Sequence, residues 1–346
     1  MNPQQARRQA AWSVLGAVLL LLAAPAFPAA VSRAYVSNED DGTVTVIDTE
    51  RLANIATVAV GKRPRGLALG PDGARLYVAL SGLPKCPPPI SDEECAKLPR
   101  DPQADGVAVV DTAALALLSV LKGVSDPERV EASRDGRWLF VTEEDAARLC
   151  ILDAARGVVI ATVAVGREPE GVRASPDGRW LLVTSETGNS VSIIDAHTHA
   201  VLHSVAVGKR PRDLAFTPDS RSAYVTGEAD ASVYRLALPG GEAVQLTQLR
   251  KEARPMGVAL DAKRGRLYVS TGHGGSVAVI SVPQGALIAE IAVGARPWGL
   301  ALTADGKRVI TANGPSGDVS IVATDSLALL GKVTAGHGPW GVVASR

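Results

Sequence analysis

The sequence predicts an all-β fold, a seven-bladed β-propeller whose last blade is built from both ends of the chain. The first observation is a repeat. The run Val60–Gly73, Val-Gly-Lys-Arg-Pro-Arg-Gly-Leu-Ala-Leu-Gly-Pro-Asp-Gly, recurs in modified form around Pro64, Pro127, Pro169, Pro211, Pro255, Pro297 and Pro339. The spacings of these anchor prolines are 63, 42, 42, 44, 42 and 42 residues. A period of about 40–45 residues is typical of four-stranded blades, because one such sheet cannot bury both faces until neighbours stack against it.

Each repeat also carries the pattern of four strands. The anchor proline opens the first strand, and a turn such as Pro71–Gly73 leads to the second, because Asp and Gly tolerate the positive φ that tight turns need. A second strand such as Leu76–Val78 and a third such as Val191–Asp195 follow, and a polar turn leads to the fourth. Their nearly continuous apolar character is typical of strands that neighbouring blades cover on both faces.

The two ends of the chain supply the third observation. Residues 31–61 contain three strand patterns, Tyr35–Asn38, Thr43–Asp48 and Ile55–Val60, but lack the strand that follows the anchor proline in the other repeats. That strand appears at the far end as Trp340–Val343. Six complete repeats and two partial ones therefore predict seven blades, with a terminal blade that joins both ends and leaves no free sheet edge.

Composition and charge exclude several classes of function. The 346 residues carry 36 Lys plus Arg and 36 Asp plus Glu, so the formal net charge is zero, and only 4% are aromatic. We expect no nucleic-acid partner, because nucleic-acid binding relies on basic patches and stacking surfaces. Although this length would suggest about two domains, the repeat predicts a single propeller over residues 31–346, since closed arrays grow by adding repeats.

The first 30 residues have the pattern of a signal peptide. Arg7 and Arg8 precede the apolar stretch Ala10–Ala24, and Ala24–Ala26 fits an Ala-x-Ala cleavage site, so we expect cleavage near residues 26–30. The stretch is shorter than the roughly 20 residues that span a membrane, which predicts no membrane span after cleavage. The expectation is a soluble, exported, periplasmic protein, with Sec and twin-arginine export both open.

Four motifs carry a resemblance to a known family. They are Tyr35–Asn38, Tyr77–Val78, Tyr224–Thr226 and Tyr268–Ser270, and they occur with Val-x-Val-Ile-Asp and x-Arg-Pro-x-Gly elements. With these motifs the chain resembles the YVTN family of seven-bladed β-propellers over residues 31–346. The resemblance implies the same fold that the repeat predicts.

Four further motifs resemble one subgroup of that family. Ser37–Glu39, Glu168–Gly171, Ser185–Thr187 and Pro339–Gly341 are similar to motifs of the β-propellers associated with PQQ-dependent alcohol catabolism in bacteria. The association implies a cellular context of quinoprotein oxidation, with a periplasmic quinoprotein dehydrogenase or its electron acceptor as the partner. It does not imply a particular reaction.

An insertion interrupts the first repeat. The interval from Pro64 to Pro127 is 21 residues longer than the 42-residue period, and the excess lies at about residues 81–105. In an oxidising compartment, Cys86 and Cys95 in this polar, proline-rich loop predict a disulfide, with two free thiols as the alternative. Cys150 lies in an apolar strand pattern and is expected to be a buried, free thiol.

Motifs of established chemistry are missing from the sequence. It contains no Cys-x-x-Cys-His, no glycine-rich phosphate loop between a strand and a helix, and no Gly-x-Ser-x-Gly. We interpret His197 and His199 as a solvated pair on the outer rim, and His273 and His337 come from different loops. The sequence therefore predicts no catalytic residues, no metal site and no cofactor.

The candidate site lies where the inner strands begin. The residue after each anchor proline varies widely: Arg65, Glu128, Glu170, Arg212, Met256, Trp298 and Trp340. The residue before it adds Arg63, Asp126, Glu168, Arg210, Arg254 and Arg296, and a second set of positions holds Glu39, Glu144, Glu186 and Glu228. All should surround one mouth of the central channel, either as a solvated ring of charge or as a pocket for a polar or anionic ligand or a partner. As ligand- or partner-binding residues we select Arg63, Arg65, Glu170, Arg212, Arg296, Trp298 and Trp340.

These observations favour a non-enzymatic, exported propeller that binds a partner or a small polar ligand and serves PQQ-dependent alcohol oxidation. Two alternatives remain open. One is a propeller enzyme, either a lactonase-like hydrolase or a redox or metal-dependent enzyme. The other is a surface adhesion propeller.

Overall fold

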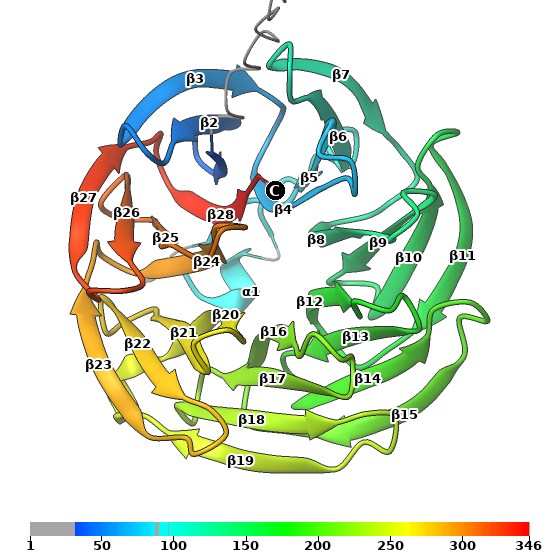
Figure 1. Ribbon diagram of the computed structural model, residues 1–346. Coiled ribbons are helices and arrows are strands. Elements are labelled where there is room, and N and C mark those ends of the chain that lie inside the picture. The colour runs from blue at the N-terminus through cyan, green and yellow to red at the C-terminus, as the bar shows by residue number, and fades with distance from the viewer. Residues whose placement is uncertain (1–31, 87–89, 96, 346) are drawn as a thin grey trace, which may run out of the picture. The chain divides into compact units, whose positions relative to one another are not determined.

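The computed structural model describes residues 32–86, 90–95 and 97–345, which form a ring of seven four-stranded antiparallel sheets (Figure 1). The expected signal peptide, residues 1–30, lies outside the described residues. The predicted all-β, seven-bladed propeller is confirmed. Each anchor proline begins the inner strand of its blade, and the fourth strand of each blade lies on the rim.

The strands of each blade follow one another from the channel to the rim. Blade 1 consists of β4 (Pro64–Leu69), β5 (Arg75–Leu80), β6 (Gly106–Asp111) and β7 (Ala116–Leu121). Blade 2 consists of β8 (Pro127–Ala132), β9 (Trp138–Glu143), β10 (Arg148–Asp153) and β11 (Val158–Ala164). Blade 3 consists of β12 (Pro169–Ala174), β13 (Trp180–Ser185), β14 (Ser190–Asp195) and β15 (Val201–Ala206). Blade 4 consists of β16 (Pro211–Phe216), β17 (Ser222–Gly227), β18 (Ser232–Ala237) and β19 (Ala243–Gln248).

The remaining blades repeat this order. The 3-10 helix η1 (Lys251–Ala253) precedes blade 5, which consists of β20 (Pro255–Asp261), β21 (Arg266–Thr271), β22 (Ser276–Ser281) and β23 (Leu287–Ala292). Blade 6 consists of β24 (Pro297–Leu302), β25 (Arg308–Asn313), β26 (Asp318–Ala323) and β27 (Leu329–Thr334). Blade 7 consists of β28 (Pro339–Ala344), β1 (Arg33–Asn38), β2 (Thr43–Asp48) and β3 (Ala53–Ala59).

Blade 7 joins the two ends of the chain, as the partial repeats predicted. The order of its strands is β28-β1-β2-β3, and Figure 1 shows the red C-terminal strand beside the blue N-terminal strands. Tyr35 of β1 pairs with Val343 of β28. Beyond these strands, the Arg33 amide donates to Ser345 Oγ at 2.9 Å, and the Ser345 amide donates to the Arg33 carbonyl at 2.7 Å. The pairing closes the ring because β1 and β28 each occupy an edge that the other would leave open.

Apolar side chains between neighbouring blades form the core. Tyr35 and Val46 of blade 7, for example, pack in one cluster with Leu76 and Val78 of blade 1. Complete burial of an aliphatic side chain of this size contributes about 1.5–3 kcal/mol to folding. This packing explains why the second and third strands are apolar along most of their length.

Hydroxyl groups on the second strands hold the inner strand of the next blade. Thr184 Oγ1 of blade 3 donates to the Arg212 carbonyl of blade 4 at 2.9 Å and accepts from the Gly171 amide at 2.7 Å. The equivalent hydroxyls of Ser37, Thr142, Thr226 and Ser270 donate to the carbonyls of Arg65, Glu170, Met256 and Trp298. Each of these carbonyls belongs to the residue after an anchor proline, so the bonds fix the backbone of the predicted site.

The residue before each anchor proline has a left-handed backbone. Its φ is 43° at Arg63, 50° at Glu168 and 46° at Arg296, and glycine occupies the equivalent position only at Gly338. Residues with a side chain rarely adopt this conformation, and such strain is concentrated at functional sites. The repeat therefore places charged side chains at a backbone position that does not favour them.

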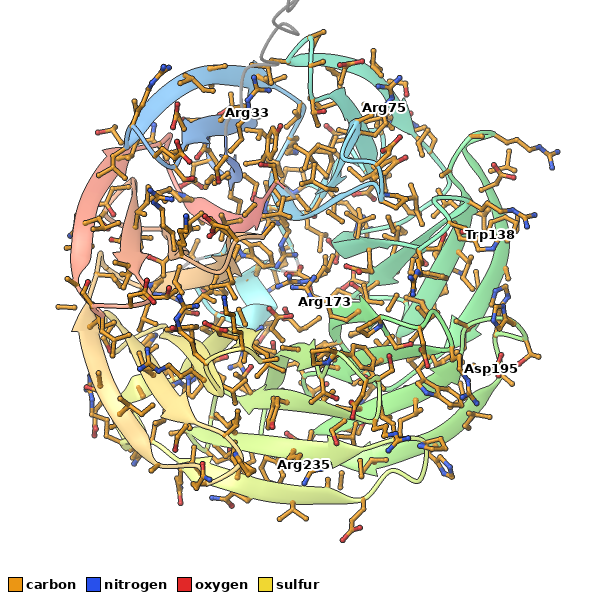
Figure 2. The ribbon with its side chains drawn as sticks, in the orientation of Figure 1. Arg33, Arg75, Trp138, Arg173, Asp195 and Arg235 are labelled. Carbon is orange, nitrogen blue, oxygen red and sulfur yellow. A yellow bond between two sulfur atoms is a disulfide. The ribbon has the colours of Figure 1, made fainter. Side chains whose placement is uncertain are left out.

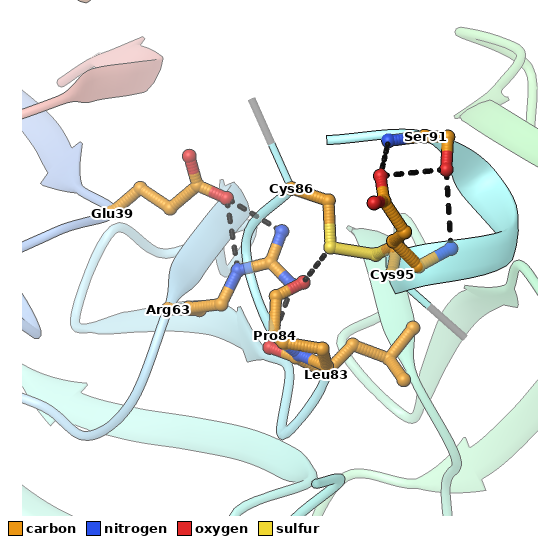
Figure 3. Close-up of a disulfide and its surroundings, with 8 residues drawn as sticks. Glu39, Arg63, Leu83, Pro84, Cys86, Ser91 and Cys95 are labelled. Carbon is orange, nitrogen blue, oxygen red and sulfur yellow. Dashed lines mark hydrogen bonds and ion pairs between the residues drawn. A yellow bond between two sulfur atoms is a disulfide. The ribbon is translucent and has the colours of Figure 1, made fainter. Parts of the chain in front are cut away.

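The described part of the segment between β5 and β6, residues 81–86, 90–95 and 97–105, lies at the mouth because Pro64 pairs with Leu80, the last residue of β5. It contains the short helix α1 (Asp92–Cys95), seen through the centre of the ring in Figure 1. The predicted Cys86–Cys95 disulfide is confirmed (Figure 3). Arg63 donates to the carbonyls of Leu83 at 2.8 Å and Pro84 at 3.1 Å, which attaches the segment to the start of β4.

Cys150 is buried and free, as predicted. Burial raises the pKa of its thiol to about 12, so the thiol stays protonated near neutral pH. Within the described ranges, no helix is long and apolar enough to cross a membrane.

Candidate functional site

Two tryptophans form an apolar wall at the mouth of the channel. The rings of Trp298 and Trp340 stack with centroids 6.0 Å apart and planes inclined by 28°. The Arg65 guanidinium lies 5.5 Å from the Trp340 ring, and that of Arg296 lies 5.0 Å from the Trp298 ring. Aromatic pairs and arginines stacked on them stabilise such a surface while leaving a flat face for a ligand.

A cavity of about 400 Å³ opens beside this wall, and we call it the mouth cavity. It is lined by Glu39, Asp40, Arg63, Arg65, Lys85, Cys86, Arg296, Trp298, Gly314, Pro315, Gly338, Pro339 and Trp340. Its volume lies in the range of small-molecule sites, and its lining combines flat apolar faces with a few charges. Lys85 and Cys86 come from the insertion, so the insertion builds one side of the cavity.

The cations of the mouth cavity differ in their partners. Arg63 donates two hydrogen bonds to Glu39, from Nε at 3.1 Å and Nη2 at 2.8 Å (Figure 3), and Lys85 contacts Glu39 at 3.3 Å. Burial alone would raise the pKa of Glu39, but Arg65, Arg63 and Lys85 outweigh it and lower that pKa. Arg296 is exposed and has neither an ion pair nor a hydrogen bond through its side chain among the described residues.

On the opposite side of the mouth, Arg212 gathers three carboxyl groups. Its guanidinium contacts Glu170, Glu186 and Glu228, the last at 2.6 Å. Only 10% of the Arg212 side chain and 8% of each carboxyl side chain are exposed. Buried charges of this kind must be paired, and Arg210 also contacts Glu186 and Glu228, while Arg254 contacts Glu228 at 2.8 Å.

Two of these carboxyl groups share a proton. The carboxyl groups of Glu170 and Glu186 are hydrogen-bonded to each other. Burial raises the pKa of Glu186 to about 9, together with the charge of Glu170 and the hydrogen bond to it. Burial opposes ionisation of Glu170 too, but Arg212 and the hydrogen bond from Glu186 outweigh it and lower the pKa of Glu170 to about 2. At neutral pH the pair therefore holds one proton, with the pKa of Glu186 raised and that of Glu170 lowered.

A second group of carboxyls surrounds Arg65. Its guanidinium contacts Glu128 and lies 3.1 Å from Glu144. Glu128 is completely buried, and this burial, which the charge of Arg65 only partly offsets, raises its pKa well above the usual value. Burial likewise raises the pKa of Glu144. Blades 2 and 3 thus each place a carboxyl group of raised pKa on this side of the mouth.

Below the mouth the channel narrows to a cavity of about 20 Å³, the waist cavity. It is lined by Arg129, Glu170, Arg212, Asp213, Met256, Gly257, Trp298, Gly299 and Trp340. This volume accommodates one water molecule or one oxygen atom of a ligand. The waist cavity therefore connects the carboxyl side of the mouth with the tryptophan wall.

The structure brings the predicted site residues together in two places. Five of them, Arg63, Arg65, Arg296, Trp298 and Trp340, line the mouth cavity. Glu170 and Arg212 line the waist cavity with both tryptophans. Sequence reasoning did not select Glu186, Lys85 or Arg129. Glu186 was recognisable from its repeat position, whereas only the folded insertion brings Lys85 to the site.

The histidines occupy separate places. His197 lies in the turn between β14 and β15 and His199 follows it, away from the mouth. His337 contacts Asp41 at 2.8 Å, and His273 lies near Arg296 and Arg254. The part of the chain that the structure describes contains no group of three or more His, Cys, Asp or Glu side chains arranged to hold a metal ion.

Two family models match parts of the chain. Residues 194–339 match the family described as Lactonase, 7-bladed beta-propeller, and residues 101–238 match the Cytochrome D1 heme domain. Each match covers less than half of the chain. No curated protein matches the sequence.

Solved propeller structures resemble the ring. A putative 6-phosphogluconolactonase from Bacteroides fragilis NCTC 9343 is 16% identical, with a TM-score of 0.73 over 92% of this chain and 99% of that chain. Hydrazine synthase of Kuenenia stuttgartiensis is 22% identical, with a TM-score of 0.70 over 84% and 92%. The dihydro-heme d1 dehydrogenase NirN is 15% identical, with a TM-score of 0.65 over 90% and 75%. At these identities the likeness establishes the fold alone.

The family matches correct the expectation of a non-enzymatic binding or scaffold protein. They are to lactonases and to a heme domain, so they favour the alternative, an enzyme or a heme-binding propeller. They support a propeller family and not the PQQ-associated subgroup. The expectation was wrong for a physical reason: it relied on motifs contiguous in the sequence, whereas Arg212 meets Glu170 and Glu186 only through the contact between blades 3 and 4. The chain is a seven-bladed β-propeller with partial matches to the lactonase and cytochrome d1 propeller families.

Proposed function

We propose that this protein is a propeller hydrolase of the lactonase type, which opens a cyclic ester at the mouth of its channel. The observation that carries the proposal is the pair Glu170 and Glu186, whose carboxyl groups share a proton beside Arg212. Two carboxyl groups whose pKa values are moved in opposite directions are suited to act as base and acid. The partial match to the lactonase family supports the same class of reaction.

In this mechanism Glu170 is the base and Glu186 is the acid. Glu170 takes a proton from a water molecule while the water oxygen adds to the ester carbonyl carbon. Glu186 then gives its proton to the ring oxygen as the bond between the carbonyl carbon and that oxygen breaks. The product is a hydroxy acid, and the hydrogen bond between the two carboxyl groups returns the proton from Glu170 to Glu186.

The other side of the mouth holds the substrate. The faces of Trp298 and Trp340 offer an apolar surface to its ring, and Arg65 is fixed between Trp340 and its carboxyl partners. A rigid wall opposite an acid–base pair limits the orientations in which a bound ring can present its carbonyl carbon. Such positioning supplies a large part of enzymatic rate enhancement.

Lactone hydrolysis by three variants tests this proposal. Release of acid from a panel of γ- and δ-lactones should be measurable with the wild type, and kcat should fall about 10²–10⁴-fold in Glu186→Gln and in Glu170→Gln. Glu290→Gln is the matched control, because Glu290 pairs with Arg250 on a rim strand. Absence of hydrolysis by the wild type, or an unchanged kcat in both mouth variants, would contradict the proposal.

A second candidate function is the binding of a heme-type macrocycle, which His273 favours. Burial together with Arg296 and Arg254 lowers the pKa of His273, so its imidazole is neutral near pH 7. A neutral imidazole is an iron ligand, and arginines suit the carboxylates of a macrocycle. The residues fit this group, which would supply redox chemistry, and the partial match to the Cytochrome D1 heme domain supports it.

Titration with hemin separates the two candidates. Binding through His273 should shift the main absorption band of the heme, and His273→Ala should remove the shift. His197→Ala is the matched control, because His197 lies in the turn between β14 and β15, away from the mouth. This variant should keep the shift. Identical spectra for the wild type and His273→Ala would eliminate the second candidate.

The subgroup resemblance adds a proposal about cellular context. We propose that the protein is exported to the periplasm and acts near PQQ-linked alcohol oxidation, with a quinoprotein dehydrogenase or its electron acceptor as a partner. The Cys86–Cys95 disulfide supports an oxidising compartment. N-terminal sequencing of the mature protein should find a start near residues 26–30. An unprocessed protein in the cytoplasm would contradict export.

A further inference from the structure

One repeat position inside the channel is occupied by glycine in five blades. These residues, two after the anchor proline, are Gly66, Gly171, Gly257, Gly299 and Gly341. A Cβ atom at Gly299 would lie 2.7 Å from the Trp340 carbonyl oxygen, and one at Gly341 would lie 2.8 Å from the Arg65 carbonyl oxygen. Neighbouring inner strands therefore approach too closely here for a side chain directed at the next blade.

Blades 2 and 4 depart from this rule with Arg129 and Asp213. Their side chains lie in the channel, where the Arg129 guanidinium is 3.6 Å from an Asp213 carboxylate oxygen and 5.8 Å from the Trp340 ring. Asp213 also contacts Arg173 at 3.3 Å, and Figure 2 shows Arg173 near the centre of the ring. Removing charges from water at such a place costs several kcal/mol per ion, so packing does not explain the exchange of glycine for arginine.

The hydrogen-bonding capacity of Arg129 is unused. A guanidinium carries five N–H donors. Among the described residues none accepts a hydrogen bond from the Arg129 side chain, and its one ion-pair contact, to Asp213, is long. Only 14% of the side chain is exposed, and it lines the waist cavity with Glu170 and Trp340. A buried cation with free donors beside a cavity for one oxygen atom is a preformed anion site.

We propose that Arg129 binds a single anionic oxygen of a carboxylate-bearing ligand in the waist cavity, at the floor of the mouth. The size of the cavity limits it to one oxygen, and Trp298 and Trp340 cover the adjoining apolar part of the ligand. Asp213, which also pairs with Arg173, is the described carboxylate that contacts the guanidinium. The site takes carboxylates and rejects their neutral amides.

If the mouth hydrolyses lactones, this site has a role in the reaction, and that role rests on the proposed function. The carbonyl oxygen becomes negatively charged when water adds to the ester, and a donor aimed at this oxygen lowers the barrier. After the ring opens, one oxygen of the product carboxylate occupies the same place. Arg129 would thus stabilise the charged intermediate and also bind the product.

Calorimetric titration with benzoate and benzamide tests the anion site without any reaction. Wild-type protein should bind benzoate at least about tenfold more tightly than benzamide, because a charge-assisted hydrogen bond to a buried guanidinium has that effect on affinity. Arg129→Gln should remove this preference, and Arg129→Lys should keep part of it. Arg137→Gln is the matched control, because Arg137 stacks on Trp138, which Figure 2 shows toward the rim.

The outcomes separate the two proposals. A preference for benzoate that disappears in Arg129→Gln supports the anion site even if no lactone is hydrolysed, in which case only the hydrolase proposal fails. Equal affinity of the wild type for both compounds overturns the anion site, and so does an undiminished preference in folded Arg129→Gln. If Arg129→Gln does not fold, a reduced preference in Arg129→Lys decides for the anion site, and full retention decides against it.

Discussion

Two sides of the mouth occupy equivalent repeat positions and have opposite chemistry. In blades 2–4 the residues after the anchor prolines are Glu128, Glu170 and Arg212, which form buried ion pairs. In blades 5–7 they are Met256, Trp298 and Trp340, which form an apolar face. Equivalent positions of a ring have nearly equivalent surroundings, so packing alone does not require this division. The repeat therefore determines where these side chains lie, whereas the function depends on which residue type each blade has at that position.

The first prediction concerns a deletion that opens the ring and removes Trp340 from the aromatic side of the mouth. Deleting residues 339–346 removes β28, leaves the edge of β1 unpaired and takes Trp340 with it. We expect a much lower melting temperature and aggregation, because an open sheet edge pairs with other chains. Trp340→Ala, which keeps the strand, should remain folded. A deletion variant with the melting temperature of the intact protein would refute closure by β28.

The second prediction concerns the ion pairs of Arg212 on the carboxyl side of the mouth. Arg212→Ala leaves Glu170 and Glu186 buried without their main cation, and breaking a buried pair of this kind costs about 3–5 kcal/mol. The loss should appear in urea denaturation at pH 7 and shrink at pH 5, where the carboxyl groups can bind protons. Arg137→Ala, on an exposed turn, serves as the control. If the free energy of unfolding falls by less than about 1 kcal/mol, the carboxyl groups are solvated and not buried.

The third prediction concerns the pH dependence of stability. The pKa of Glu186 is raised from 4.5 to about 9, so the folded protein keeps a proton that the unfolded chain releases. The free energy of unfolding should therefore fall as pH rises between these values, by at most about 1.4 kcal/mol per pH unit. Glu186→Gln should flatten this decline. Parallel stability curves for the two proteins from pH 5 to 8 would show that Glu186 does not hold the proton.

The smallest effect is expected on the aromatic side. Trp298 is partly exposed, so Trp298→Ala should weaken binding of an aromatic carboxylate about tenfold, which corresponds to about 1.4 kcal/mol, while the pH dependence of stability stays unchanged. Trp138→Ala is the matched control, because Trp138 begins β9 at the end of the strand away from the mouth. Unchanged affinity in Trp298→Ala would leave the carboxyl side as the only functional half of the mouth.

The sequence was sufficient to predict the fold, because the anchor prolines mark every inner strand and the two partial repeats require each other. It also placed Glu170 and Trp298 at one mouth, since both follow such prolines. It could not predict that Glu170 and Glu186 share a proton, because that depends on burial and on Arg212 from the next blade. Arg129 was missed for a similar reason: its unused donors become evident only inside the narrowed channel.

Titration of the glutamate carboxyl carbons by NMR tests the central claim, the shared proton of Glu170 and Glu186, most directly. With ¹³C-labelled glutamate, the carboxyl carbon of Glu186 should keep the chemical shift of the protonated form through neutral pH and lose it near pH 9, as its pKa requires. Its signal should be missing in Glu186→Gln. If every glutamate carboxyl of the wild type is ionised by about pH 6, the pair holds no proton and the acid–base account is wrong.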